Sequence, residues 1–210
     1  SRDLMFSELQ HRVSNNLANV AALLKLQANA TDSVQTRKAL TASVARVQTV
    51  ARIQRNLYLP NEQEVEVMAF LEQLAQDTQE SMSLGKDVSV TVTSDRFRIQ
   101  RDQAVPFGLV VSELIMNAME HSQTTDDNLN IGILCTRSTD QSTGQSKIFL
   151  SVTDNGQGVS EAFDNTPSDS LGMRIASGFA EGLGGQLSLG NKPDGGGAIA
   201  TLEFPEPSED

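Results

Sequence analysis

The sequence predicts an α+β protein, with an antiparallel helical hairpin over residues 1–60 and an α/β sandwich over residues 61–210. Apolar residues recur every three or four positions in the first part, whereas the second part contains short alternating segments rich in β-branched residues. The charge divides at the same place. Residues 1–60 carry eight Lys/Arg against three Asp/Glu, and residues 61–210 carry eight against twenty-four. We therefore expect two units with different partners.

Composition narrows the classes of protein that fit. The net charge of −11 makes general nucleic-acid binding a poor expectation. No apolar run approaches the length of a membrane span, and no signal-peptide pattern opens the chain. The single cysteine, Cys135, lies in an apolar stretch and is interpreted as a core residue. These features predict a cytoplasmic protein without a direct membrane segment.

The first helix of the hairpin is expected over residues 2–28. Its predicted seam consists of residues spaced by three and four: Phe6, Leu9, Val13, Leu17, Val20 and Leu24. Asp32 or Ser33 is expected to cap a second helix over Val34–Leu59, which Pro60 ends. Because a lone hairpin cannot bury both of its faces, we expect a homodimer that forms a four-helix bundle.

The second part is predicted to form a mixed sheet with helices on one face. In chain order we expect a helix over Val65–Met82 after a short strand, strands over Val88–Val92 and Arg96–Gln100, a helix from about Gln103, strands over Leu129–Leu134 and Lys147–Thr153 around a polar turn at Thr136–Ser146, a helix over Leu171–Leu183, and strands over Gln186–Leu189 and Ala198–Phe204. The polar segment Gly158–Ser170 is expected to be a mobile loop, and the tail from Glu206 is expected to fray.

The stretch 109–122, LVVSELIMNAMEHS, predicts an amphipathic helix with three polar side chains along one stripe. Glu113, Asn117 and His121 are four residues apart, just over one helical turn, so they project from the same face. A carboxylate, a carboxamide and an imidazole in register can hold a hydrated divalent cation and the phosphates that it bridges. Alone, this pattern is more typical of the solvated face of an ordinary core helix.

Two further features are also ambiguous alone. Asp154 follows a predicted buried strand, where a carboxylate needs a partner, and Gly156 and Gly158 permit close backbone approach. Without other motifs this segment is best interpreted as a hairpin turn. His11 is predicted to face away from the hairpin seam, and a lone histidine on a helix is usually an ordinary residue.

Five motifs follow one another in order: HRVSNNL at His11–Leu17, the 109–122 stretch, DNGQG at Asp154–Gly158, SLGMR at Ser170–Arg174, and GGG at Gly195–Gly197 followed by TLEFP at Thr201–Pro205. The first resembles the phosphoacceptor box HRVKNNL of the HisKA-2 and HWE group of sensor histidine kinases. The other four resemble the N, G1, G2 and terminal boxes of the ATP-binding fold of histidine kinases and related GHKL ATPases. The resemblance covers nearly the whole chain and implies a dimerisation and phosphotransfer hairpin at 1–60 and a catalytic ATP-binding domain at 61–210.

This resemblance assigns roles in the hairpin and in the 109–122 helix. It makes His11 the phosphoacceptor and places Asn15 where a side chain orients a water or an attacking carboxylate. It makes Asn117 the Mg²⁺ ligand, with Glu113 supporting the metal or its water. His121 is expected to reach the phosphates of ATP.

The resemblance also assigns roles in the remaining motifs. Asp154 is expected to bind the exocyclic amine of adenine, and Thr201 to hold it through water. Gly156 and Gly158 allow the backbone to approach the nucleotide. The helix that opens at Gly172 is expected to present backbone N–H groups to the phosphates.

The leading interpretation is a histidine kinase core that autophosphorylates on His11 and passes the phosphoryl group to a response-regulator aspartate, with a sensor domain upstream of this chain. Two departures from the family pattern leave alternatives open: Ser14 and Glu120 stand where lysine is usual. One alternative is a histidine phosphotransfer protein whose catalytic-like domain no longer binds ATP. The other is a non-kinase ATPase of the same fold, in which the HRVSNNL hairpin has no role.

Overall fold

The computed structural model describes residues 2–57, 63–82, 87–122, 128–159 and 170–206. The chain divides into two compact units, Ser1–Gln63 and Glu64–Asp210. The predicted helix end at Leu59 and Pro60 lies outside the described residues. Among the helices that are described, none combines the length and the apolar character needed to cross a lipid bilayer.

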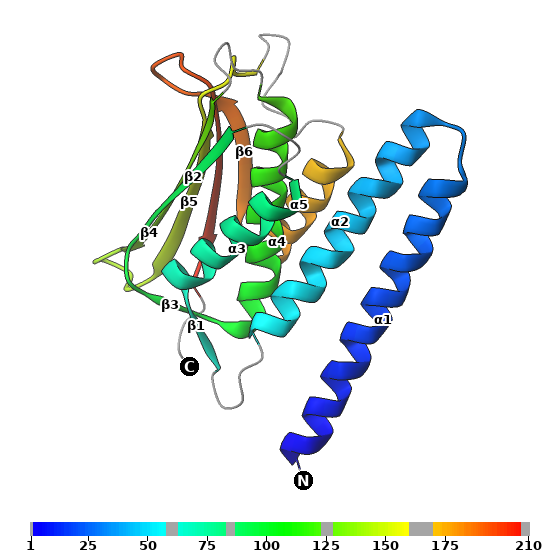
Figure 1. Cartoon of the computed structure of the whole chain (residues 1–210). Helices are drawn as coiled ribbons and strands as arrows, with labels where there is room; N and C mark the ends of the chain where they lie inside the picture. The colour runs from blue at the N-terminus through cyan, green and yellow to red at the C-terminus, as the bar shows by residue number, and fades with distance from the viewer. Residues whose placement is uncertain (1, 58–62, 83–86, 123–127, 160–169, 207–210) are drawn as a thin grey trace. The chain divides into compact units, whose positions relative to one another are not determined.

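The first unit is a helical hairpin of α1 (Arg2–Ala30) and α2 (Val34–Leu57) (Figure 1). Of the two predicted capping residues, Ser33 is the cap: its Oγ accepts the Thr36 N–H at 3.2 Å. Arg37 of α2 stabilises the connection between the two helices from the α2 side. Its guanidinium donates to the carbonyl oxygens of Thr31 at 2.6 Å and of Ala28 at 3.2 Å, which satisfies acceptors left open at the end of α1.

The predicted seam of α1 is partly wrong. Ala21 and Ala28 are buried, whereas Val13 and Val20 are 44% and 45% exposed. Leu17 is half-buried, as expected for a seam residue. The stripe that faces α2 therefore shares Leu17 with the predicted seam but contains Ala21 and Ala28 in place of the two valines. A prediction from hydrophobicity places the valines in the seam, but α2 packs against the smaller alanines.

The second unit begins with β1 (Glu64–Glu66), and its described residues contain three helices, α3 (Val67–Met82), α4 (Arg101–His121) and α5 (Leu171–Gly182). Its other strands are β2 (Asp87–Ser94), β3 (Arg98–Gln100), β4 (Asn128–Thr139), β5 (Ser146–Asp154), β6 (Gln186–Asn191) and β7 (Ala198–Pro205). The main sheet has the order β2-β4-β5-β7-β6, with β2 parallel to β4 and the other pairs antiparallel. β1 and β3 form a separate antiparallel pair.

The three described helices lie on one face of the main sheet, which confirms the predicted α/β sandwich (Figure 1). The core between the layers is centred on Phe107 of α4, which is fully buried. Its ring centroid lies 6.4 Å from that of Phe70 on α3 and 5.5 Å from that of Phe204 on β7. Aromatic pairs at these separations add to the free energy gained by burial, so this contact ties both helices to the sheet.

Two predicted boundaries in this unit are wrong. β4 continues to Thr139, whereas the sequence predicts a turn from Thr136. The strand is longer because every residue of β5 pairs with β4, up to Thr139 opposite Ser146. Glu206 is not frayed: its carboxylate accepts from Arg137 Nε at 2.8 Å, and its N–H donates to the Ser146 carbonyl at 2.9 Å. Most of the loop predicted at Gly158–Ser170 lies outside the described residues.

Cys135 is a core residue, as its apolar neighbours in the sequence predicted. Burial raises the pKa of its thiol from 9.0 to about 12, against a smaller opposite effect of the hydrogen bond with Ser94. Alkylation by iodoacetamide, which needs the thiolate, is therefore expected to be slow at pH 8 in the folded protein and fast in urea. The free energy of unfolding is also expected to fall as the pH rises above about 9, because the unfolded chain releases this proton first. Rapid alkylation without denaturant would contradict the assignment.

Candidate functional site

A cavity of about 280 Å³ lies within the second unit, enclosed by α4, the start of α5 and strands β5, β6 and β7. Most of the side chains that line it are aliphatic: Leu114, Ala118, Val152, Val159, Met173, Leu189, Ala198 and Ala200. The others are Asn117, His121, Ser122, Asp154, Gly158 and Ser170. Aliphatic walls with a few polar groups, in a volume near 300 Å³, are typical of a small-molecule site.

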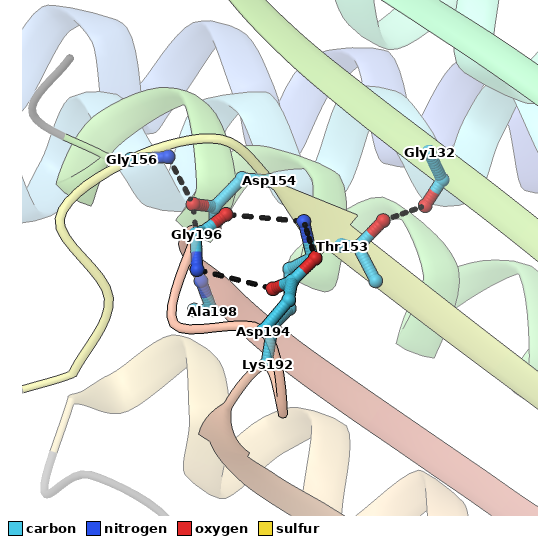
Figure 2. Close-up of polar contacts among 8 residues, drawn as sticks. All are labelled: Gly132, Thr153, Asp154, Gly156, Lys192, Asp194, Gly196 and Ala198. Atoms are coloured by element: carbon cyan, nitrogen blue, oxygen red, sulfur yellow. Dashed lines mark hydrogen bonds and ion pairs between the residues drawn. The ribbon is translucent and has the colours of Figure 1, made fainter.

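Asp154 is the single carboxylate among the lining residues that the structure describes. It is the last residue of β5 and only 8% exposed. Its Oδ1 accepts the Gly156 N–H at 2.8 Å and the Ala198 N–H at 3.3 Å (Figure 2). Within the described residues both of its hydrogen bonds go to Oδ1. The carboxylate is thus held in one orientation, and no described residue donates a hydrogen bond to Oδ2.

The predicted glycines lie at close approaches of the backbone. A Cβ on Gly156 would lie 2.9 Å from the Cβ of Ser122 and 3.0 Å from Asp154 Oδ1, so a side chain there would push the end of α4 from the loop. Gly158 lines the cavity and has a φ of +80°, which favours glycine. Gly172 is buried in the first turn of α5 and does not line the cavity, whereas Ser170 and Met173 do.

Helix α4 presents one face to the cavity. Leu114, Asn117, Ala118 and His121 follow the spacing of three and four residues that brings side chains to one side of a helix. The Asn117 Nδ2 atom is buried and has no hydrogen-bond partner among the described residues. Glu113 is 3% exposed and is not among the lining residues. A buried amide nitrogen without a described partner can be satisfied by water or by a group that binds in the cavity.

His121 and Glu120 differ in their relation to the cavity. His121 is exposed and lines the cavity, whereas Glu120 is exposed and does not. Their side chains are nevertheless close, with 3.9 Å between His121 Nε2 and Glu120 Oε2. A negative charge therefore lies near the polar end of the cavity wall.

Thr201 is a further predicted site residue that does not line the cavity. Its hydroxyl lies 2.6 Å from that of Ser188, its partner on β6, on the solvent-facing side of the sheet. The cavity side of β7 is formed instead by Ala198 and Ala200. Successive side chains of a strand point to opposite faces, so a residue one position from Ala200 cannot share its side.

The predicted hairpin residues lie in the other unit. The backbone of His11 is part of α1, and the structure does not describe its side chain. Asn15, four residues later, is exposed. Glu8 and Arg12 form an exposed ion pair, with 2.8 Å between the Arg12 Nη2 and Glu8 Oε1 atoms. The Glu8 carboxylate is therefore engaged with Arg12.

Sequence reasoning missed several lining residues. Ser170 carries a recognisable signal, since it is the N-cap of α5 and its Oγ accepts the Met173 N–H at 3.3 Å. Val152 and Ala200 could have been found from the alternation of their strands. Ser122, just beyond α4, carries no such signal, because its place depends on how the helix end packs against Gly156.

Comparison with known proteins assigns this arrangement to a family. Residues 8–82 match a family model described as histidine kinase. Residues 102–208, about half of the chain, match the model of the histidine kinase-, DNA gyrase B- and HSP90-like ATPases, and this match contains every residue that lines the cavity. The chain belongs to the sensor histidine kinase family. Both domains characteristic of its HisKA-2 group are present in the expected order.

Named relatives agree with this assignment. The sensor histidine kinase PdtaS of Mycobacterium tuberculosis is 31% identical over 177 residues, which cover 83% of this chain and 34% of that protein. The blue-light-activated histidine kinase 2 of Erythrobacter litoralis is 25% identical over 208 residues, covering 97% of this chain and 57% of that protein. The chain therefore spans between a third and three fifths of the length of these histidine kinases.

A solved structure shows the same fold. The histidine kinase domain of the Erythrobacter litoralis EL346 blue-light activated histidine kinase superposes with a TM-score of 0.63 at 24% identity, covering 97% of this chain and 92% of that domain. At this identity the likeness concerns the fold. It extends over both units of this histidine kinase chain, the hairpin and the ATPase-type sandwich.

Proposed function

We propose that this chain is the transmitter core of a cytoplasmic sensor histidine kinase. In this proposal residues 1–60 form the dimerisation and phosphotransfer hairpin, and residues 61–210 bind ATP and catalyse phosphorylation of His11. A response-regulator aspartate then receives the phosphoryl group. The observation that carries the proposal is Asp154, a buried carboxylate held by two backbone N–H groups at the end of an aliphatic cavity.

The cavity fits the base of ATP better than a fully charged ligand. Its aliphatic walls suit a flat heteroaromatic ring, and Asp154 Oδ2 is an acceptor for the exocyclic amine of adenine. Gly158 allows the loop backbone to lie close to the ligand. The triphosphate is assigned to the polar side, near His121 and Ser170 at the start of α5.

Asn117 is the residue that we assign to Mg²⁺. Its amide nitrogen has no partner among the described residues, and its carboxamide oxygen is an atom that can ligate a hard cation. The described residues contain no cluster of three His, Cys, Asp or Glu side chains that could hold a metal alone. This fits a cation that is held largely by substrate phosphates and one or two side chains, and bound Mg²⁺ would neutralise the developing phosphate charge. Glu113, one turn earlier, supports Asn117 in this proposal.

The transfer itself is assigned to His11. A neutral imidazole nitrogen attacks the γ-phosphorus in line, the bond to the β–γ bridging oxygen breaks, and ADP leaves. Imidazole has an ordinary pKa of about 6.5, so the neutral form dominates above pH 7. Asn15 lies four residues further along α1 and is exposed, which suits a role in orienting a water or a receiver carboxylate.

The hairpin also supports dimerisation. The large side chains of Val13, Val20, Leu23 and Leu26 are all exposed on α1. Several large apolar side chains exposed on one helix favour an interface there. We therefore propose that a second copy covers α1 to complete a four-helix bundle. The basic balance of residues 1–60 would favour docking of an acidic receiver domain.

The test is incubation of the whole chain with γ-labelled ATP and Mg²⁺. We expect label on the protein that is lost in acid and retained in base, as a phosphorus–nitrogen bond requires. Binding of ADP should be measured on the same sample by titration calorimetry. Absence of both label and ADP binding would favour the phosphotransfer alternative, and ADP binding with ATP hydrolysis but no label would favour the non-kinase ATPase.

Glu120 supplies a separate prediction. Its carboxylate lies 3.9 Å from His121 Nε2, beside the proposed phosphate position, where it repels the triphosphate. Glu120→Lys is therefore expected to tighten ATP binding about threefold at low salt, with a smaller effect at high salt. Adenosine, which carries no phosphate, serves as the control ligand and should bind equally to both proteins. Equal ATP affinities at low salt would contradict a phosphate site at this position.

A further inference from the structure

The turn between β6 and β7, residues 191–198, holds both ends of the loop at 154–159, which we call the glycine loop. At one end Ala198 N–H donates to Asp154 Oδ1 at 3.3 Å. At the other end the Asn191 carboxamide makes two hydrogen bonds to Val159: its Oδ1 accepts the Val159 N–H at 2.6 Å, and its Nδ2 donates to the Val159 carbonyl at 3.0 Å. One turn thus sets the positions of two segments that are far apart in the sequence.

The turn and the glycine loop also fit together without room for side chains. Gly197 has a φ of +115°, and a Cβ there would collide with the Asp154 carbonyl oxygen. A Cβ on Gly158 would collide with Asn191 Oδ1 and lie 3.4 Å from the Gly197 carbonyl oxygen. The contact is therefore made by backbone against backbone, with the Asn191 carboxamide filling the remaining space.

The turn is itself rigidly built. Lys192 Nζ donates to the Gly196 carbonyl at 3.1 Å, and Gly196 N–H donates to Asp194 Oδ1 at 3.1 Å (Figure 2). The Lys192 ammonium also lies 3.5 Å from Asp194 Oδ2. The backbone closes the same turn, since Lys192 N–H donates to the Gly197 carbonyl at 2.9 Å. These hydrogen bonds therefore fix the position of Asn191, which lies at the base of the turn.

We infer that Asn191 is a positioning residue of the nucleotide site, which sets the backbone of Gly158 and Val159 against the cavity. This inference rests on the proposed function, because it takes the cavity to be the nucleotide site. Asn191 does not line the cavity, whereas Gly158 and Val159 do, so it acts through the glycine loop. A carboxamide suits this task because it supplies an acceptor and a donor to the N–H and carbonyl of one residue.

The test compares Asn191→Ala with the unmodified chain by titration with ADP and with adenosine. Loss of both hydrogen bonds is expected to weaken both ligands about fivefold. Asp140→Ala is the matched control: Asp140 Oδ1 accepts from Ser142 N–H, Ser142 Oγ and Thr143 N–H in the β4–β5 turn, at the end of β4 remote from Asp154. It removes comparable hydrogen bonds of a turn and should lower Tm without changing either affinity.

Asn191→Asp separates positioning from general stability. An aspartate still accepts the Val159 N–H, but its second oxygen would face the Val159 carbonyl, acceptor against acceptor, so adenosine affinity should be restored only in part. Amide exchange of Val159, measured without nucleotide, should speed up in Asn191→Ala and return toward its original rate in Asn191→Asp. Unchanged affinities in Asn191→Ala, or an equal loss in Asp140→Ala, would overturn the inference while leaving the proposed function standing. A chain that binds neither ADP nor adenosine would instead overturn the proposed function, and the inference with it.

Discussion

His11→Ala is expected to reduce incorporation of label from γ-labelled ATP to background. The chain contains two histidines, and the other, His121, is assigned to phosphate contact rather than attack. Alanine has no nucleophilic nitrogen, so no phosphorus–nitrogen bond can form at this position. The measurement is acid-labile, base-stable label per chain after a fixed incubation, with Asn117→Ala as a second variant that should lose label for want of Mg²⁺.

The two variants should differ in nucleotide binding. Because His11 lies in the first unit and the cavity in the second, His11→Ala is expected to bind ADP with unchanged affinity. Its loss of label would then be due to the acceptor and not to the nucleotide site. Unchanged incorporation of label in His11→Ala would contradict the assignment of His11 as the phosphoacceptor. Analysis of the labelled peptide would then identify the residue that carries the label.

Asp154→Asn is expected to weaken ADP and ATP binding by about 10- to 100-fold. Asparagine keeps an oxygen that accepts the Gly156 and Ala198 N–H groups, so the glycine loop should hold its shape. Its NH₂ group, however, would face the exocyclic amine of adenine, donor against donor, and a charge-assisted hydrogen bond is lost. Titration with ADP, with a thermal melt on each sample, measures the affinity and checks the fold.

Two controls sharpen this experiment. Thr201→Val removes the hydrogen bond to Ser188 on the solvent-facing side of the sheet and should leave ADP affinity unchanged. Inosine diphosphate carries a carbonyl where adenosine diphosphate carries the amine, so Asp154→Asn should weaken it less. An Asp154→Asn protein that melts normally and binds ADP like the unmodified chain would show that Asp154 is not the adenine contact.

Several features of the site were predictable because they depend on local periodicity. Asn117 and His121 reach the cavity through helical spacing, which any amphipathic helix enforces. Asp154 was found because a carboxylate after an apolar strand needs a partner. Its two hydrogen-bond donors were not predicted, since one of them, Ala198, lies 44 residues away.

Three of the differences from the predictions concern which face of an element turns inward. Glu113 lies on the same stripe as Asn117, yet Leu114 and Ala118 line the cavity beside Asn117. Glu113 is buried in α4 but does not line the cavity. Thr201 differs from Ala200 by one position and so faces away. In α1 the seam shifted from Val13 to the stripe of Ala21 for the same reason. Sequence patterns define faces, but packing chooses which face turns inward.

The sequence by itself determined the family, the order of the two units, the elements of the sandwich and the identity of most polar residues near the cavity. These follow from periodicity, turn chemistry and motif order, which are properties of neighbouring residues. The tertiary structure alone decided which residues enclose the cavity, the removal of Thr201 from it, and the place of Asn191 against Val159, 32 residues away in the chain. Such contacts form only when distant segments pack together. Local sequence patterns do not determine the distance or the relative orientation of two segments that are far apart in the chain.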